Sequence, residues 1–209
     1  MNNDVVAIIP WLPNPSRQHG FEWVKAWYEH RVGVVDVSET VEPFSKAKAI
    51  NEGVKRHPGK ILVIADADCV ICNRAFNVSV EMVRQDPTHL VLPHNSLCLT
   101  TLQQANYLLA LDPTKSVSGR LFRGTRKNRK CPGGIWVVNQ KLLADNPVDE
   151  RFIGWGHEDN ELLSRVPHKR IDGPIFHIWH ERASRKNAAK NRRMAIDSIR
   201  ENEKANPPK

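Results

Sequence analysis

Two aspartates, Asp66 and Asp68, follow an apolar run, Ile-Leu-Val-Ile-Ala, at residues 61–65. The run predicts a buried strand, and side chains two residues apart in extended chain point the same way. Two carboxylates placed in this way form a hard oxygen site for a divalent cation. An apolar strand does not lead into two charges unless something compensates them, so we favour a metal site over a solvated strand end.

A second group of acids follows a tryptophan between glycines. Residues 152–161 read Phe-Ile-Gly-Trp-Gly-His-Glu-Asp-Asn-Glu. Glu158, Asp159 and Glu161 fall in the first turn of a predicted helix, where the helix dipole stabilises acids. A capped helix start explains the acids but not Trp155 in a Gly-x-Gly bend before them. A carboxylate beside an aromatic wall suits a general base for a hydroxyl, because the wall partly desolvates it.

Two histidines, His177 and His180, end the last predicted strand at residues 171–180. A lone histidine is usually packed or on the surface, but two of them near a strand end become candidate ligands when an Asp-x-Asp motif needs more donors. Imidazole beside carboxylates favours Mn²⁺ over Mg²⁺.

The elements that must position these residues alternate between strand and helix. We predict strands at residues 4–9, 33–37 and 60–64, with helices at 16–31 and 46–56 between them. Pro10 closes the first strand, and Ser16 caps the first helix. The alternation implies βαβ units and a mostly parallel sheet, in which ligands bind beyond the carboxyl ends of the strands.

Length and composition fit one globular domain: the chain has 209 residues, of which 40% are hydrophobic. No stretch approaches the roughly 18 apolar residues of a membrane span, and the start lacks a basic signal region. The four cysteines are too scattered for a disulfide framework. No second pair completes a zinc site with Cys69 and Cys72, which we expect in or near the core. We therefore expect a cytosolic protein, in a bacterium or a phage-infected host.

The net charge of +8 is concentrated in two clusters. One runs from Lys115 to Lys130 and contains no acid, and the other runs from Arg182 to Arg193. Such clusters bind anions or form a solvated loop and a solvated helix face, and charge alone leaves both open.

Taken together, these motifs resemble the nucleotide-sugar-dependent glycosyltransferases of the GT-A fold. The likeness is to the catalytic domain of the β1,4-galactosyltransferase family and its relatives among the polypeptide N-acetylgalactosaminyltransferases. It runs from Ile8 to about Asn191 in the same motif order. Residues 154–159 resemble the family's Gly-Trp-Gly-Gly-Glu-Asp signature, with His157 in place of the second of the adjacent glycines.

The resemblance implies roles for single residues. Asp159 would be the catalytic base, and Glu158 would hold the acceptor sugar. Asp66 and Asp68 match the metal motif, and His177 and His180 resemble the family's Met-x-x-His metal pair. The residues that correspond to donor contacts are Pro10, Arg17, Phe44, Lys46, Asn51, Asp66, Gly134 and Trp155.

The resemblance also implies an α/β single domain at residues 1–201, with a mostly parallel central sheet flanked by helices. A Rossmann-like nucleotide-sugar half would reach about residue 70, and an acceptor and catalytic half would cover 71–181. Residues 182–201 would form a lid over the donor or a plain helix, and 202–209 a frayed tail. The cofactor would be Mn²⁺ or Mg²⁺ and the donor a UDP-sugar. Retaining N-acetylgalactosaminyl relatives carry Asn at the position of Asp159, so the Asp favours inversion.

The acceptor stays open at this point. The cluster from Lys115 to Lys130 precedes the Gly-Gly turn at residues 133–134, on the acceptor side of this fold, and suits DNA with hydroxymethylated bases or an acidic glycan. A soluble loop is the alternative. A nucleic-acid-binding protein with an inactive glycosyltransferase-like core is a rival, against which the intact acids and His180 argue. A nucleotidyltransferase would need a glycine-rich loop after the first strand, and residues 10–15 contain no glycine.

Overall fold

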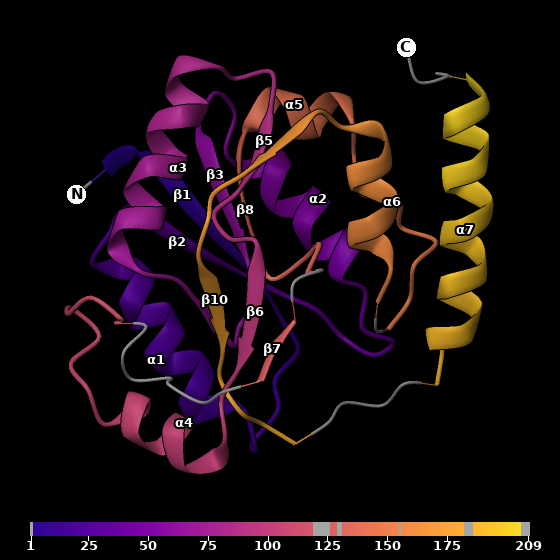
Figure 1. The fold of residues 1–209 in the computed structure, drawn as a ribbon. Coiled ribbons are helices and arrows are strands. Elements are labelled where there is room, and N and C mark those ends of the chain that lie inside the picture. Colours follow the sequence, from indigo (N-terminus) through magenta and orange to yellow (C-terminus); the bar gives the residue numbers. More distant parts are fainter. Residues whose placement is uncertain (1, 119–125, 129–130, 155, 182–185, 206–209) are drawn as a thin grey trace.

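The structure is a computed structural model that describes residues 2–118, 126–128, 131–154, 156–181 and 186–205. A six-stranded sheet runs through the centre, with helices against its faces and a four-stranded sheet beside it (Figure 1). The mixed α/β domain agrees with the predicted fold class.

The elements follow one another as the strand-helix alternation predicts in the first third of the chain. The strands are β1 (Asn2–Trp11), β2 (Val32–Glu39), β3 (Ile61–Ala65), β4 (Cys69–Val70), β5 (Leu90–Leu92), β6 (Ser96–Leu99), β7 (Arg126–Asn128), β8 (Ile135–Asn139), β9 (His168–Arg170) and β10 (Pro174–His177). The helices are α1 (Gln18–Glu29), α2 (Lys46–Arg56), α3 (Asn73–Gln85), α4 (Leu102–Leu109), α5 (Gln140–Asp145), α6 (Glu158–Arg165) and α7 (Ala188–Ala205).

The strand order of the larger sheet is β2-β1-β3-β8-β5-β9, and that of the smaller sheet is β4-β10-β6-β7. Strand β8 is antiparallel to both of its neighbours, whereas the other pairs of the larger sheet are parallel. The chain passes from β3 in the larger sheet to β4 in the smaller one through the Asp-x-Asp motif. The two aspartates therefore lie at the junction of the two sheets.

The apolar run of β1 is buried because the sheet is covered on both sides. Val5 belongs to the hydrophobic cluster that contains Trp27 of α1, and Val6 belongs to the cluster that contains Ile50 of α2. Successive strand residues point to opposite faces, so a strand between two helical layers has few polar residues.

The helix over residues 46–56 is confirmed to the residue, and Ser45 caps it by accepting a hydrogen bond from Lys48 N at 3.3 Å. The predicted cap of the first helix is wrong. Helix α1 begins at Gln18, and Ser16 instead donates from its backbone to Asn14 Oδ1 at 3.0 Å. A local turn between these two residues competes with the cap, as is usual for short polar side chains.

Strand β1 also continues through Pro10 to Trp11, two residues beyond its predicted end. Its pairing with β3 ends at Ile8, and only β2 accompanies it further. Proline is tolerated there because one side of β1 has no neighbouring strand to receive an N–H.

Helix α7 lies outside the sheet layers, alongside α6 (Figure 1). Asn202 Nδ2 donates to Ser164 Oγ at 3.0 Å, and the helix extends to Ala205, beyond the point where we expected fraying to begin. Among the described residues, no helix combines the length and the apolar character that a membrane crossing requires.

Candidate active site

The Asp-x-Asp motif forms a turn. Asp66 N donates to Gly134 O at 2.8 Å, and Cys69 N donates to Asp66 O at 3.1 Å. The prediction of extended chain with parallel carboxylates is therefore wrong. The turn is needed because the chain changes sheets here, and it directs the two side chains to different partners.

Asp68 lies among two histidines and an arginine. Its Oδ2 pairs with Arg17 and lies 3.0 Å from His180 Nε2, and its Oδ1 lies 3.7 Å from His177 Nε2. Burial opposes ionisation, but His177, His180 and Arg17 together hold the pKa of Asp68 far below its usual value. The hydrogen bond to Asp68 raises the pKa of His180. The predicted grouping of Asp68 with both histidines is present. Arg17, which we predicted as a donor contact, pairs with the same carboxylate.

Asp66 pairs instead with Lys46, the first residue of α2. Lys46 Nζ lies 2.8 Å from Asp66 Oδ1, 3.4 Å from Glu158 Oε1 and 3.2 Å from Asp159 Oδ1. Burial disfavours the charge on Lys46, but the three carboxylates hold its pKa well above the usual value. One ammonium therefore joins Asp66 of the metal motif to Glu158 and Asp159, the acids of the signature at residues 154–159, which is called the acceptor signature below.

Two adjacent glycines bring the backbone against these acids. A Cβ at Gly133 would lie 1.9 Å from Asp159 Oδ2, so any side chain there would displace the carboxylate. Gly134 has φ +95°, in the region that favours glycine, and its Cβ would lie 2.5 Å from Ile175 Cδ1. The absence of a side chain at Gly133 therefore leaves the space that the Asp159 carboxylate occupies.

The acids of the acceptor signature begin helix α6, as the sequence predicts. His157 precedes them with φ +79°, a left-handed conformation at the position where the resembling family has glycine. Only 5% of Glu158 is exposed, and its Oε2 has no hydrogen-bond partner among the described residues. A buried carboxylate oxygen without a protein partner is costly, so this oxygen is free to accept a hydrogen bond from a water or a bound hydroxyl.

The environment gives Asp159 a pKa suited to proton transfer. Burial, together with the charge of Glu158, raises it to about 7, although Lys46 acts in the opposite direction. A general base works best when its pKa lies near the pH at which it operates.

The predicted donor contacts that remain are Pro10, Phe44, Asn51 and Trp155. Pro10 is buried at the end of β1, and Phe44 O accepts from Gly154 N at 2.8 Å, which ties the start of α2 to the acceptor signature. Asn51 has a different role, because its amide binds Val148 O and Glu150 Oε1, each at 2.9 Å. Trp155 lies outside the described residues.

The basic clusters can be placed only in part. Residues 119–125, 129–130 and 182–185 lie outside the described residues. The segment that we expected to be a lid or a helix is a helix from Ala188 onward, and Asn191 Nδ2 donates to Ile153 O at 3.1 Å. The start of α7 is thereby held next to the acceptor signature.

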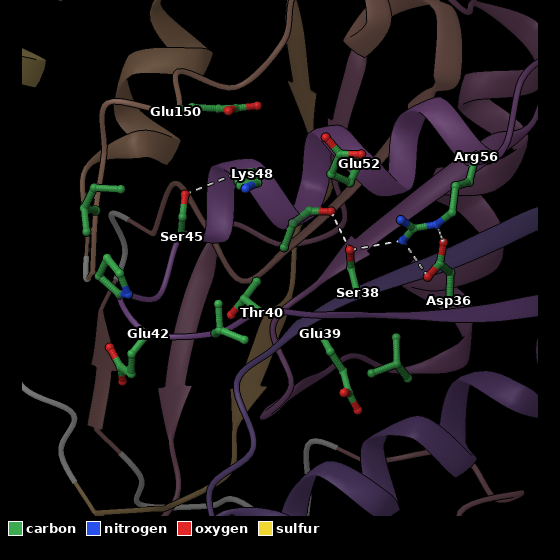
Figure 2. Close-up of a pocket in the computed structure, with 15 residues that line it drawn as sticks. Asp36, Ser38, Glu39, Thr40, Glu42, Ser45, Lys48, Glu52, Arg56 and Glu150 are labelled. Atoms are coloured by element: carbon green, nitrogen blue, oxygen red, sulfur yellow. Dashed lines mark hydrogen bonds and ion pairs between the residues drawn. The ribbon is translucent and has the colours of Figure 1, made fainter.

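A pocket of about 710 Å³ lies between the end of β2 and α2 (Figure 2). Ser45 and Lys48 line it, next to Lys46, but none of the four site carboxylates does. Its charged lining residues are Asp36, Glu39, Glu42, Glu52, Glu150, Lys48 and Arg56. This excess of acid suits neutral or cationic groups better than a diphosphate.

The donor set fits a divalent cation. One carboxylate and two imidazoles gather at Asp68, and Asp66 lies on the same turn. Carboxylate and imidazole together are ligands of Mn²⁺ and later divalent metals.

Sequence reasoning found these residues but missed the contact of Lys46 with three acids and that of Gly133 with Asp159. The Phe-Ser-Lys and Gly-Gly segments marked Lys46 and Gly133 as candidates. Their distances to the acids arise only from the fold.

No family model and no curated protein matches the chain. Several solved structures do match the chain. A mutant of Drosophila β1,4-galactosyltransferase 7 with manganese, UDP-Gal and xylobiose is 13% identical at TM-score 0.57, over 92% of this chain and 80% of that one. GalNAc-T7 with UDP, GalNAc and Mn²⁺ is 12% identical at TM-score 0.52, over 94% of this chain and 49% of that one.

Glucosyl-3-phosphoglycerate synthase from Mycobacterium tuberculosis, with Mn²⁺, UDP-glucose and phosphoglyceric acid, is 14% identical at TM-score 0.55, over 95% of this chain and 79% of that one. These three structures each match more than nine-tenths of this chain. The chain therefore has the GT-A glycosyltransferase fold that its motifs predicted.

Proposed function

We propose that the protein is a metal-dependent glycosyltransferase that moves a hexosyl unit from a UDP-sugar to an acceptor hydroxyl, with inversion at the anomeric carbon. One observation carries the proposal. Lys46 Nζ lies within 3.4 Å of Asp66, Glu158 and Asp159, so the metal motif and the acceptor acids form one charged centre. The GT-A fold supports it, because the three solved structures above were obtained with Mn²⁺ and UDP or a UDP-sugar.

Asp68, His177 and His180, with Asp66, would hold the cation. When bound, a divalent metal neutralises the donor's diphosphate as a Lewis acid, both for binding and for departure. Arg17, paired with Asp68, and Lys46, paired with Asp66, are the protein's own cations at this place. In this proposal both bind phosphate oxygens once a metal compensates the carboxylates.

Asp159 takes the proton of the acceptor hydroxyl. The freed oxygen forms a bond to the anomeric carbon as the bond to the diphosphate breaks, and the electron pair leaves with UDP. Attack opposite the leaving group inverts the configuration. The unpaired Oε2 of Glu158 accepts a hydrogen bond from another acceptor hydroxyl and so orients the sugar.

We further propose an anionic acceptor, such as an acidic glycan or modified DNA. Lys190, Arg192 and Arg193 are exposed on the first turns of α7, which Asn191 ties to the acceptor signature at Ile153. Glucosyl-3-phosphoglycerate synthase, whose structure contains phosphoglyceric acid, is a precedent for an anionic acceptor on this fold.

The experiment is a panel of nucleotide sugars, assayed for binding and slow hydrolysis with Mn²⁺ present or chelated. We expect a UDP-sugar to bind and hydrolyse only with the metal. The variant Asp68→Asn should lose both, whereas Asp145→Asn, an exposed acid on α5, should retain both. Binding of no donor would overturn the proposal and favour a nucleic-acid-binding protein with an inactive core.

A further inference from the structure

A thiol lies within the candidate metal site. Cys69 Sγ donates to Asp68 Oδ1 at 3.3 Å, and His177 Nε2 lies 3.7 Å from the same oxygen. The ligand atoms of these three residues all lie within 4.8 Å of one another. The glycosyltransferase reaction described above uses the carboxylate and the imidazole but gives the thiol no part.

The backbone fixes the thiol in this place. Strand β4 is antiparallel to β10, and Cys69 is the direct partner of His177 across the ladder. Directly opposed residues of an antiparallel pair project to the same face of a sheet. Ile178 N donates to Asp68 O at 2.8 Å and so continues the same pairing. The strand register therefore places Cys69 beside His177, and the turn before β4 brings Asp68 to them.

Gly134 lies beside the sulfur. A Cβ at Gly134 would lie 3.5 Å from Cys69 Sγ, in van der Waals contact, so a longer side chain at this position would compete for the space. Cys69 itself is 1% exposed and faces the side on which Asp68 and His177 lie. The three donors therefore lie together at the junction of the two sheets.

The spacing fits a small tetrahedral ion. Zn²⁺ binds oxygen or nitrogen at about 2.0 Å and sulfur at about 2.3 Å, which places two tetrahedral ligands roughly 3.5 Å apart. The distances from Asp68 Oδ1 to the sulfur and to the imidazole nitrogen are 3.3 and 3.7 Å. Carboxylate, thiolate and imidazole are also a softer set than the oxygen ligands that suit Mg²⁺ or Mn²⁺.

We propose that Asp68, Cys69 and His177 form a thiolate-containing site for Zn²⁺ or Co²⁺. Metal binding releases the Cys69 proton to the solvent, and the sulfur becomes a ligand. The site shares Asp68 and His177 with the Mn²⁺ site of the proposed function and in that respect rests on it. A bound Zn²⁺ would hold these two side chains away from the donor diphosphate, so Zn²⁺ inhibits a transfer reaction that Mn²⁺ supports.

The test is a titration of the metal-stripped full chain with Co²⁺, followed by absorption spectroscopy. A thiolate ligand gives Co²⁺ a charge-transfer band in the near ultraviolet, whereas nitrogen and oxygen ligands do not. We expect one equivalent of Co²⁺ to develop the band and Zn²⁺ to remove it. Cys69→Ser should abolish the band, and Cys98→Ser, a matched change at an equally buried cysteine, should retain it.

X-ray absorption of the Zn²⁺-loaded natural sequence covers the case in which Cys69→Ser does not fold. One sulfur at about 2.3 Å from zinc is expected. A shell of nitrogen and oxygen alone, no Co²⁺ band, or a band that persists in Cys69→Ser would overturn the proposal. None of these readouts uses a donor sugar, so the thiolate site and the glycosyltransferase function can fail separately.

Discussion

The backbone of Gly133 touches the carboxylate of Asp159: a Cβ at Gly133 would lie 1.9 Å from Asp159 Oδ2. The Asp159 carboxylate is therefore positioned by the absence of a side chain on a neighbouring turn as much as by its own helix. The same carboxylate accepts a hydrogen bond from Lys46 at 3.2 Å, so two elements distant in sequence determine its place.

Gly133→Ala should displace Asp159 and lower donor hydrolysis by roughly 100-fold, the usual effect of a misplacement of about 1 Å. Steady-state hydrolysis of the bound UDP-sugar measures this effect. Gly20→Ala is the matched control, because a Cβ in α1 meets only Ile178 Cγ2 at 4.0 Å. Full hydrolysis by Gly133→Ala would show that the contact does not fix the base.

Lys46→Met should leave three carboxylates without their shared cation. Removing one partner of a buried ion pair costs about 3–5 kcal/mol of unfolding free energy. Lys46→Arg keeps the charge and should lose much less. Thermal unfolding measures both variants, and Mn²⁺ should restore much of the loss in Lys46→Met because it replaces the missing positive charge. Equal stability of the two variants would contradict this assignment.

His157→Gly should be tolerated because His157 has φ +79°. A left-handed conformation costs a residue with a Cβ roughly 1–2 kcal/mol, and the cost is highest for β-branched residues. We expect denaturant unfolding to place His157→Gly within about 1 kcal/mol of the natural sequence, since glycine also gains entropy when unfolded. His157→Val should be clearly less stable. The reverse order would mean that the contacts of His157 outweigh its backbone strain.

His94 should make folding sensitive to acid. It is fully buried, and burial, together with Arg170, lowers its pKa from 6.5 to about 4. Below pH 6.5 the unfolded chain takes up a proton that the folded chain refuses, so stability falls as the pH drops toward 4. The fall attributable to His94 is about 3 kcal/mol. Denaturant unfolding between pH 7 and 4 should show a shallower slope for His94→Gln, and parallel curves would contradict the assignment.

Sequence patterns predicted the elements with local signals. Helix α2 has its serine cap and apolar spacing within a dozen residues, and its bounds were correct. The pairing of strand β8 could not be predicted from local signals. Its place between β3 and β5, antiparallel to both, depends on pairing across more than forty residues. No local pattern encodes such a partner.

The same distinction applies to the site. Asp68, Asp159 and His180 were predicted from motifs as site residues, because few side-chain types can bind a metal ion or accept a proton. The turn at Asp66 follows from the change of sheet between β3 and β4, which the run of residue types does not reveal. Asn51 matched a family position but binds Val148 and Glu150, since a motif does not specify the direction of a side chain.

Donor hydrolysis by Asp159→Asn tests the central claim most directly. The change keeps the size of the side chain and removes its ability to take a proton. We expect Mn²⁺-dependent binding of the UDP-sugar to stay nearly unchanged while its hydrolysis falls by roughly 100-fold or more, the scale of a general base. Near-normal turnover with intact binding would contradict the assignment of Asp159 as the base and, with it, the proposed mechanism.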